Sequence, residues 1–406
     1  MAAAGRAASY YCTFARPPMP LTGILPPLLF SLAFLLPAWW CVRTRHLGLA
    51  IIPACTALLL SAATLAIWYQ DYDRVQAHHD LHTLVTELER SDLYGNGDLR
   101  EAEETLFLFS SGSQALARGL TYDTLRADSI RRVMKRMADW TIRYRNLPQW
   151  APGSDWDREV YFLAHAGIVL GEYQLATNDE TYAPYLQRIG RYLGGRLMRG
   201  HYKHLISHAD ESLLRPADNA AAIYALSLYD AYYGETYART TRAEWTAYID
   251  KELHYAESRL PCAAFTTTNR CSIEPSAAAT GLYICYRAAS ATAAPADDIP
   301  YREWLHYFKR FSGNPFSLSV RPNMRDGEVA RLCNAGLSPL ECGQYEDAIG
   351  LWAAAAYGGG YTYFRIFAGY VFDRWFGSAP EYARMRPARR VRALTEVALR
   401  TIGEGH

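Results

Sequence analysis

The chain has 406 residues, 50% of them apolar, so it is long enough to bury a large core. Its formal net charge of +1 excludes a strong overall field that would attract nucleic acid or acidic partners. It contains no Walker loop, dinucleotide fingerprint or GxSxG elbow, so phosphate, nicotinamide and serine-hydrolase chemistry have no support. Tyrosine is in excess, with 30 copies, and its amphipathic ring suits the lining of a pocket.

Two apolar segments lie near the start of the chain, Leu21 to Cys41 and Leu47 to Tyr69. Each has about the 20 apolar residues that span a bilayer, and neither contains a charged residue. Each also ends on a pair of aromatic residues, which is typical of a membrane interface. The sequence therefore predicts a multi-pass anchor in the inner cell membrane over residues 1–74, followed by a soluble domain over residues 75–406.

Four cysteines beyond the anchor form two pairs, Cys262 with Cys271 and Cys333 with Cys342, each nine residues apart. Two loop-closing disulfides would suit an oxidising compartment, but reduced cysteines in loops explain the spacing equally well. Positive charges flank the apolar segments almost evenly, so the positive-inside rule does not decide the orientation. On the cysteines alone, we expect the soluble domain on the periplasmic or external side.

From residue 75 onward, segments with apolar residues at helical spacing follow one another, and strand signals are almost absent. They are Leu81–Arg90, Leu99–Gly119, Tyr122–Arg145, Asp157–Thr177, Tyr182–Met198, Asp218–Tyr233, Arg242–Ser258, Glu274–Ala288, Tyr301–Phe311, Tyr345–Tyr357, Tyr361–Trp375 and Pro387–Thr401. Alternate members are apolar on most faces, whereas the intervening ones are amphipathic. This alternation predicts an all-α fold, an α/α toroid (a barrel of five to six helical hairpins), preceded by two transmembrane helices.

Three stretches repeat an acidic residue, a helix rich in small residues and then an aromatic residue: Asp218–Tyr229, Glu274–Tyr286 and Tyr345–Tyr357. An acid at a helix N-terminus is favoured by the macrodipole, and like units should point their N-termini at one shared place. The longest loops precede these helices, so a toroid would place them on the same rim. The candidate catalytic acids are therefore Asp218, Glu274 and Asp347. Each of them also fits a purely structural role as a cap or first-turn acid.

A family resemblance appears over Phe162–Leu175 (FLAHAGIVLGEYQL) and Asp218–Leu253 (DNAAAIYALSLYDAYYGETYARTTRAEWTAYIDKEL). The ordered series is similar to the bacterial linalool dehydratase-isomerase family, clearly over Asp157–Leu253 and loosely to about Trp375. The resemblance implies an α/α-barrel enzyme that interconverts terpenoid alcohols by dehydration and allylic rearrangement, without a cofactor, as a homo-oligomer.

His165 matches the active-site histidine of that family, although a histidine among apolar residues also fits a core position. The family's two cysteines, nine residues apart, fall at about Ala209 and at Asp218, and no cysteine lies between Cys55 and Cys262. The resemblance thus transfers the fold better than the reaction. An aspartate whose pKa is raised by an apolar cavity would be a competent proton donor in place of a cysteine.

We therefore expect a lyase or isomerase that acts on a terpenoid or other lipophilic alcohol by acid/base catalysis in a central cavity. His165, Asp218, Glu274 and Asp347 would supply acid and base, and tyrosines the wall facing cationic character. Its partners would be a small lipophilic substrate and membrane lipid, not nucleic acid.

Two alternatives come from other functional classes. One is a glycan-cleaving α/α-barrel enzyme in which Asp218 with Glu274 or Asp347 flanks the scissile bond. The other is a non-catalytic, membrane-tethered binding module.

Three histidines, His201, His204 and His208, have a spacing that could reach a metal. No zinc pattern is complete, so we predict a solvated loop there and no metal.

Overall fold

The computed structural model of the chain describes residues 19–94, 99–199, 204–291, 298–311, 316, 318–322, 344–377 and 380–404. This part of the chain is mostly helical, with a few short strands, as the sequence predicts. The second predicted cysteine pair, Cys333 with Cys342, lies outside the described residues.

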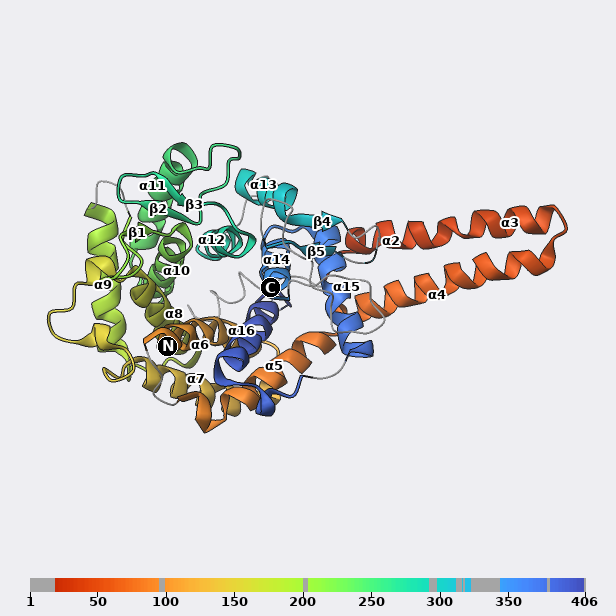
Figure 1. The fold of residues 1–406 in the computed structure, drawn as a ribbon. Helices are drawn as coiled ribbons and strands as arrows, with labels where there is room; N and C mark the ends of the chain where they lie inside the picture. Colours follow the sequence, from red (N-terminus) through yellow and green to blue (C-terminus); the bar gives the residue numbers. More distant parts are fainter. Residues whose placement is uncertain are drawn as a thin grey trace.

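The N-terminal apolar segments form a long hairpin that projects away from the other helices (Figure 1). Its first arm comprises α2 (Leu21–Ala33) and α3 (Leu35–Arg43), and its second arm is α4 (Leu47–Tyr72). The two arms are 23 and 26 residues long and, by length and composition, apolar enough to cross a membrane. Most of their large apolar side chains are exposed, unlike those of a helix in a protein core.

Twelve further helices follow in the described chain. They are α5 (Val75–Leu88), α6 (Leu99–Gly119), α7 (Ala127–Thr141), α8 (Val160–Thr177), α9 (Ala183–Arg199), α10 (Pro216–Tyr233), α11 (Tyr237–Glu252), α12 (Ala277–Ala289), α13 (Ile299–Phe308), α14 (Gln344–Ala356), α15 (Gly360–Phe376) and α16 (Pro387–Glu404). Short 3-10 helices are η1 (Ser91–Tyr94), η2 (Thr124–Arg126), η3 (Pro148–Trp150), η4 (Trp156–Arg158) and η5 (Tyr382–Arg384).

The even-numbered helices from α6 to α16 contact one another in sequence, and α16 also contacts α6. The odd-numbered helices pack against them, for example α7 on α6 and α8, and α9 on α8 and α10. Close approach of α8 and α10 depends on glycine: a Cβ at Gly167 would lie 3.0 Å from the Cβ of Ala225, and one at Gly171 would lie 2.9 Å from the Cβ of Leu228. Small residues therefore let two buried helices pack backbone to backbone.

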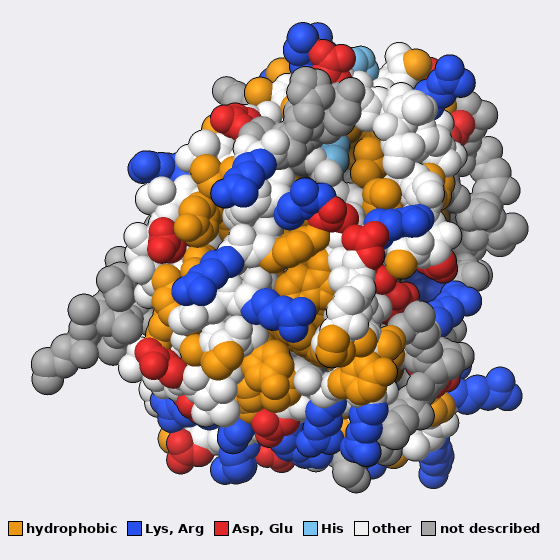
Figure 2. All heavy atoms as spheres, turned by 90° about the vertical axis from the view of Figure 1, so that its left-hand side faces the viewer, with side chains coloured by type: hydrophobic (Ala, Val, Ile, Leu, Met, Phe, Trp, Pro, Cys, Tyr) orange, Lys and Arg blue, Asp and Glu red, His pale blue; other side chains and the backbone are white. Residues whose placement is uncertain are grey.

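Among the odd-numbered helices, α7 and α9 carry many of the solvent-facing residues. α7 and α9 have buried apolar residues on one face and arginines on the other, the pattern of a surface helix. Figure 2 looks onto the side where α9 and α11 lie and shows a strip of hydrophobic side chains bordered by basic and acidic ones. The predicted alternation of buried and amphipathic helices is present from α8 to α14, whereas α15, predicted to be amphipathic, is buried along most of its length.

Short antiparallel strands occupy the loops that precede the buried helices. They are β1 (Leu213–Leu214), β2 (Ala264–Thr266), β3 (Cys271–Ile273), β4 (Lys309–Phe311) and β5 (Leu318–Val320). β1, β2 and β3 form one sheet, and β4 pairs with β5. β1 precedes α10 and β2 precedes α12, so their pairing brings the two loops side by side. Cys262 and Cys271 form a disulfide beside this sheet, with their Cα atoms 5.8 Å apart.

Helix ends differ from the predicted ones where a side chain caps the backbone. The helix predicted from Glu274 begins at Ala277, because Ser276 accepts a hydrogen bond from the Ala279 N–H at the N-cap. The helix predicted from Tyr122 begins at Ala127, after Asp123 accepts a hydrogen bond from the Arg126 N–H. In both cases the residues before the capping side chain belong to a loop and not to the helix.

Candidate functional site

A group of polar side chains lies among the N-terminal turns of the buried helices. His165 is on the second turn of α8, only 2% exposed, and its Nδ1 lies 2.9 Å from the Oγ of Ser110 on α6. Three aromatic rings surround the imidazole: Phe107 at 5.1 Å, Tyr161 at 4.5 Å and Tyr286 at 6.3 Å between centroids. His165 is therefore enclosed by an aromatic wall with one hydroxyl partner.

Burial fixes the protonation state of His165. Burial, together with a smaller effect of the nearby His208, lowers the pKa of the imidazole to about 3. His165 is consequently neutral at physiological pH. In the tautomer whose Nδ1–H donates to Ser110, the other ring nitrogen, Nε2, keeps its lone pair.

His208 belongs to the loop before β1 and lies beside the same aromatic wall. Its ring is 4.8 Å from that of Tyr161, and its Nδ1 is 3.3 Å from the Oε1 of Glu103 on α6. Burial lowers the pKa of His208, but the hydrogen bond to Glu103, the charge of Asp218 whenever that carboxyl is ionised, and the charge of Glu103 outweigh burial, so the pKa is raised. His208 therefore favours its charged form more than an ordinary histidine does.

Asp218 lies in the first turn of α10 and is 8% exposed. Burial raises the pKa of its carboxyl group, although Ser207, His208 and Arg215 act in the opposite direction. Among the described residues its Oδ2 has no hydrogen-bond partner. A buried carboxyl with a raised pKa and an unused oxygen is able to donate a proton to a bound group.

Two tyrosines connect Asp218 with His165. The hydroxyl of Tyr161 donates to the carbonyl oxygen of Glu103 at 2.9 Å, and both the Asp218 and Tyr286 side chains lie close enough to raise the pKa of Tyr161 further. Tyr286 is buried and lies beside Ser110. His165 and Asp218 thus face one shared cluster.

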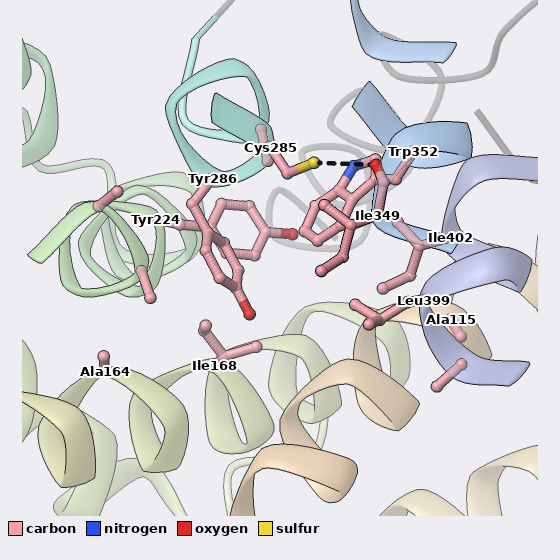
Figure 3. Close-up of a cluster of buried hydrophobic side chains, with 14 of the residues drawn as sticks. Ala115, Ala164, Ile168, Tyr224, Cys285, Tyr286, Ile349, Trp352, Leu399 and Ile402 are labelled. Carbon is pink, nitrogen blue, oxygen red and sulfur yellow. Dashed lines mark hydrogen bonds between the residues drawn. The ribbon is translucent and has the colours of Figure 1, made fainter. Parts of the chain in front are cut away.

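Between the same helices lies a cluster of buried hydrophobic and aromatic side chains. Figure 3 shows part of this cluster, with Ala115 from α6, Ile168 from α8, Tyr224 from α10, Trp352 from α14 and Ile402 from α16. The hydroxyl of Tyr224 donates to the buried carboxylate of Glu172 at 2.5 Å.

The structure does not bring the other two predicted acids to this cluster. Glu274 is exposed in the loop before α12, where it accepts a hydrogen bond from the Tyr255 hydroxyl at 3.1 Å. Asp347 is buried at the start of α14, but its Oδ1 accepts the Val320 N–H at 2.6 Å and its Oδ2 faces the Ser319 hydroxyl at 3.5 Å. Asp347 therefore holds β5 against α14.

Sequence reasoning missed several members of the cluster. It assigned His208 to a solvated loop, whereas the structure packs its ring on Tyr161; His201 of the same loop lies outside the described residues. It also gave no role to Ser110 or Glu103, because a serine or a glutamate within a helix carries no distinctive spacing. Tyr286 did have a signal, since it is the aromatic residue that closes the second sequence repeat.

Within the described ranges no group of three or more His, Cys, Asp or Glu residues is placed to hold a metal ion. No protein-family model matches the chain, and none of the curated proteins matches its sequence.

Proposed function

We propose that residues 75–406 form an α/α toroid whose inner helices are α6, α8, α10, α12, α14 and α16. The support is the closed series of contacts among these six helices, with α5, α7, α9, α11, α13 and α15 packed outside them. The pairing of β1 with β2 is further support, because it brings two of the loops that precede inner helices to the same end of the proposed toroid. In this arrangement His165 and Asp218 lie near the rim, with the aromatic lining below them.

On this fold we propose a cofactor-free dehydratase or isomerase that acts on a terpenoid or similar lipophilic alcohol. The observation that carries the proposal is the pairing of a neutral, buried His165 with a buried Asp218 of raised pKa, beside one aromatic wall. Loss of water from such an alcohol needs a proton donor for the leaving hydroxyl, a proton acceptor for a carbon-bound hydrogen, and a dry site that tolerates positive charge. The resemblance to the linalool dehydratase-isomerase family points to the same chemistry.

The proposed reaction balances within the site. The Asp218 carboxyl gives its proton to the substrate hydroxyl, and the C–O bond breaks to release water. Nε2 of His165 takes a proton from a neighbouring carbon, and that C–H electron pair forms the new double bond. The site is left with an aspartate anion and an imidazolium cation, and transfer of that proton back through water restores the starting state. Isomerisation is the other branch: before any carbon-bound proton is lost, the released water attacks the far end of the allylic cation, and Nε2 of His165 takes the proton from the new C–OH₂ group.

The apolar hairpin gives the proposed enzyme its location. We propose that both arms cross the inner membrane, which holds the domain close to a store of lipophilic substrate. The Cys262–Cys271 disulfide supports a periplasmic domain, because such bonds persist in oxidising compartments. Self-association, as in the family it resembles, is part of the same proposal.

The test is turnover by the full-length protein in nanodiscs, given terpenoid alcohols and, separately, glycans. We expect alkene or rearranged alcohol from the terpenoids, with a loss of about 10²–10⁴-fold in His165→Ala and in Asp218→Asn. Matched controls are His306→Ala, an exposed histidine, and Asp128→Asn, whose side chain is 89% exposed; both should keep full activity. Product that survives both site changes would refute these roles, and turnover of glycans alone would refute the reaction class.

A further inference from the structure

Exposed aromatic residues gather where the apolar hairpin joins the rest of the protein. Tyr69 and Tyr72 on the last turns of α4 are 52% and 54% exposed. Trp375 and Phe376, at the end of α15, are 39% and 61% exposed. In a protein surrounded by water such a group of large exposed rings would be unusual, and it marks an interaction surface.

These two sets of rings lie at the same level along the hairpin. Arg374, the residue before Trp375, has its Nη1 3.5 Å from the Oε1 of Gln70 on α4. α15 also contacts α2, and Figure 1 shows it lying across the base of the hairpin, where α2 begins and α4 ends. The rings of Phe372 and Phe376 stack at 6.1 Å, so the end of α15 presents a continuous aromatic edge.

Hydrogen bonds fix the hairpin against α15. Asp71 accepts the N–H of Met19 with one oxygen and the hydroxyl of Tyr363 on α15 with the other, each at 2.7 Å. The indole N–H of Trp68 donates to the Met19 carbonyl at 3.2 Å. These bonds join Met19 to the end of α4 and the end of α4 to α15, so the position of α15 along the hairpin is set by the fold.

We propose that the last turn of α15, together with Tyr69 and Tyr72, is a surface that inserts into the headgroup layer of the bilayer. The proposal rests on the proposed crossing of the membrane by the hairpin. Charged residues Asp71 and Asp73 follow the apolar run of α4, so the water boundary falls at the level of these aromatic rings. Tryptophan, tyrosine and arginine are the residues that favour this layer, and the Arg374 guanidinium lies within reach of lipid phosphates.

Photo-crosslinking to lipid tests the surface directly. The full-length protein is placed in nanodiscs of phosphatidylcholine and phosphatidylglycerol, with p-benzoylphenylalanine replacing one residue at a time: Phe376, Trp375, Leu58 or Leu125. Leu58 lies midway along α4 and is 71% exposed, and Leu125 lies just before α7 and is 96% exposed. After irradiation, we expect the mass of one phospholipid to be added at Phe376, Trp375 and Leu58, and no addition at Leu125.

Each other outcome contradicts a specific statement. Lipid addition at Leu58 but at neither Phe376 nor Trp375 would overturn the headgroup surface and leave the membrane-spanning hairpin standing. No addition at Leu58 would overturn both the hairpin and the surface that rests on it. Equal addition at Leu125 and Phe376 would mean that the contact with lipid is unspecific, and would also overturn the surface.

Discussion

Packing of α9 against α10 permits a sharp test of the fold around the site. Gly190 is buried on α9, and a Cβ there would lie 2.6 Å from Cγ and 2.8 Å from Cε2 of Tyr229. The Tyr229 ring cannot easily move, because it lies 4.7 Å from the ring of Tyr233 and stacks at 6.3 Å on Tyr237. Gly190→Ala should therefore force two helices apart.

The magnitude follows from two opposing effects. Alanine is favoured over glycine in a helix by about 1 kcal/mol, whereas overpacking costs about 1–3 kcal/mol. The matched control is Gly195→Ala on the same helix, where a Cβ meets nothing within 4 Å. That change should keep the gain in helix stability without the cost of overpacking. We expect Gly190→Ala to be less stable than Gly195→Ala by roughly 1–3 kcal/mol, which for a chain of this length is about 1–2 °C in melting temperature for each kcal/mol. Thermal unfolding followed by circular dichroism measures this, and a Gly190→Ala protein that melts at or above the control would refute the packing.

Two further predictions concern titration and covalent structure. Burial raises the pKa of Glu396 on α16 from 4.5 to about 7, so its folded state binds the proton more tightly and loses stability as pH rises through this interval. Glu396→Gln should therefore be more stable than wild type by up to about 3 kcal/mol above pH 7 and equal to it below pH 4.5. The control Glu381→Gln, whose side chain is 63% exposed, should change the stability little. Denaturant unfolding above pH 7 and below pH 4.5 measures the difference. The Cys262–Cys271 bond closes a loop with a sequence separation of 9, so changing both residues to serine should cost about 3 kcal/mol. Alkylation of Cys262 in the unreduced native protein would contradict the bond.

The helices were predictable because their apolar residues recur at one period. α8 and α10 are buried on nearly every face, and their sequences are apolar throughout. α7 and α9 are buried on only one face, and their apolar residues recur at helical spacing. The strands were not predictable. β1 has two residues and β2 three, too short for an alternating pattern, and the partner of Leu213 is Thr266, far along the chain.

The three repeated acids show what a sequence pattern leaves open. Asp218, Glu274 and Asp347 each precede or open a helix, so by sequence they are equivalent. The structure separates them by what meets their oxygens: backbone N–H and a hydroxyl for Asp347, a surface tyrosine for Glu274, and for one oxygen of Asp218 no partner among the described residues. Only long-range packing decides which acid keeps hydrogen-bonding capacity for a ligand.

The two histidines explain why the proposed donor is Asp218 and the proposed acceptor His165, and not the reverse. His165 would have to be charged to donate, and burial opposes this by lowering its pKa to about 3. Asp218 would have to be ionised to accept, and burial opposes that too, by raising its pKa. Proton transfer in the proposed direction creates an anion at Asp218 beside His208, whose raised pKa favours the cation, so opposite charges meet where the new charge forms. The same transfer leaves the net charge of the cluster unchanged, which matters most where the surroundings are apolar.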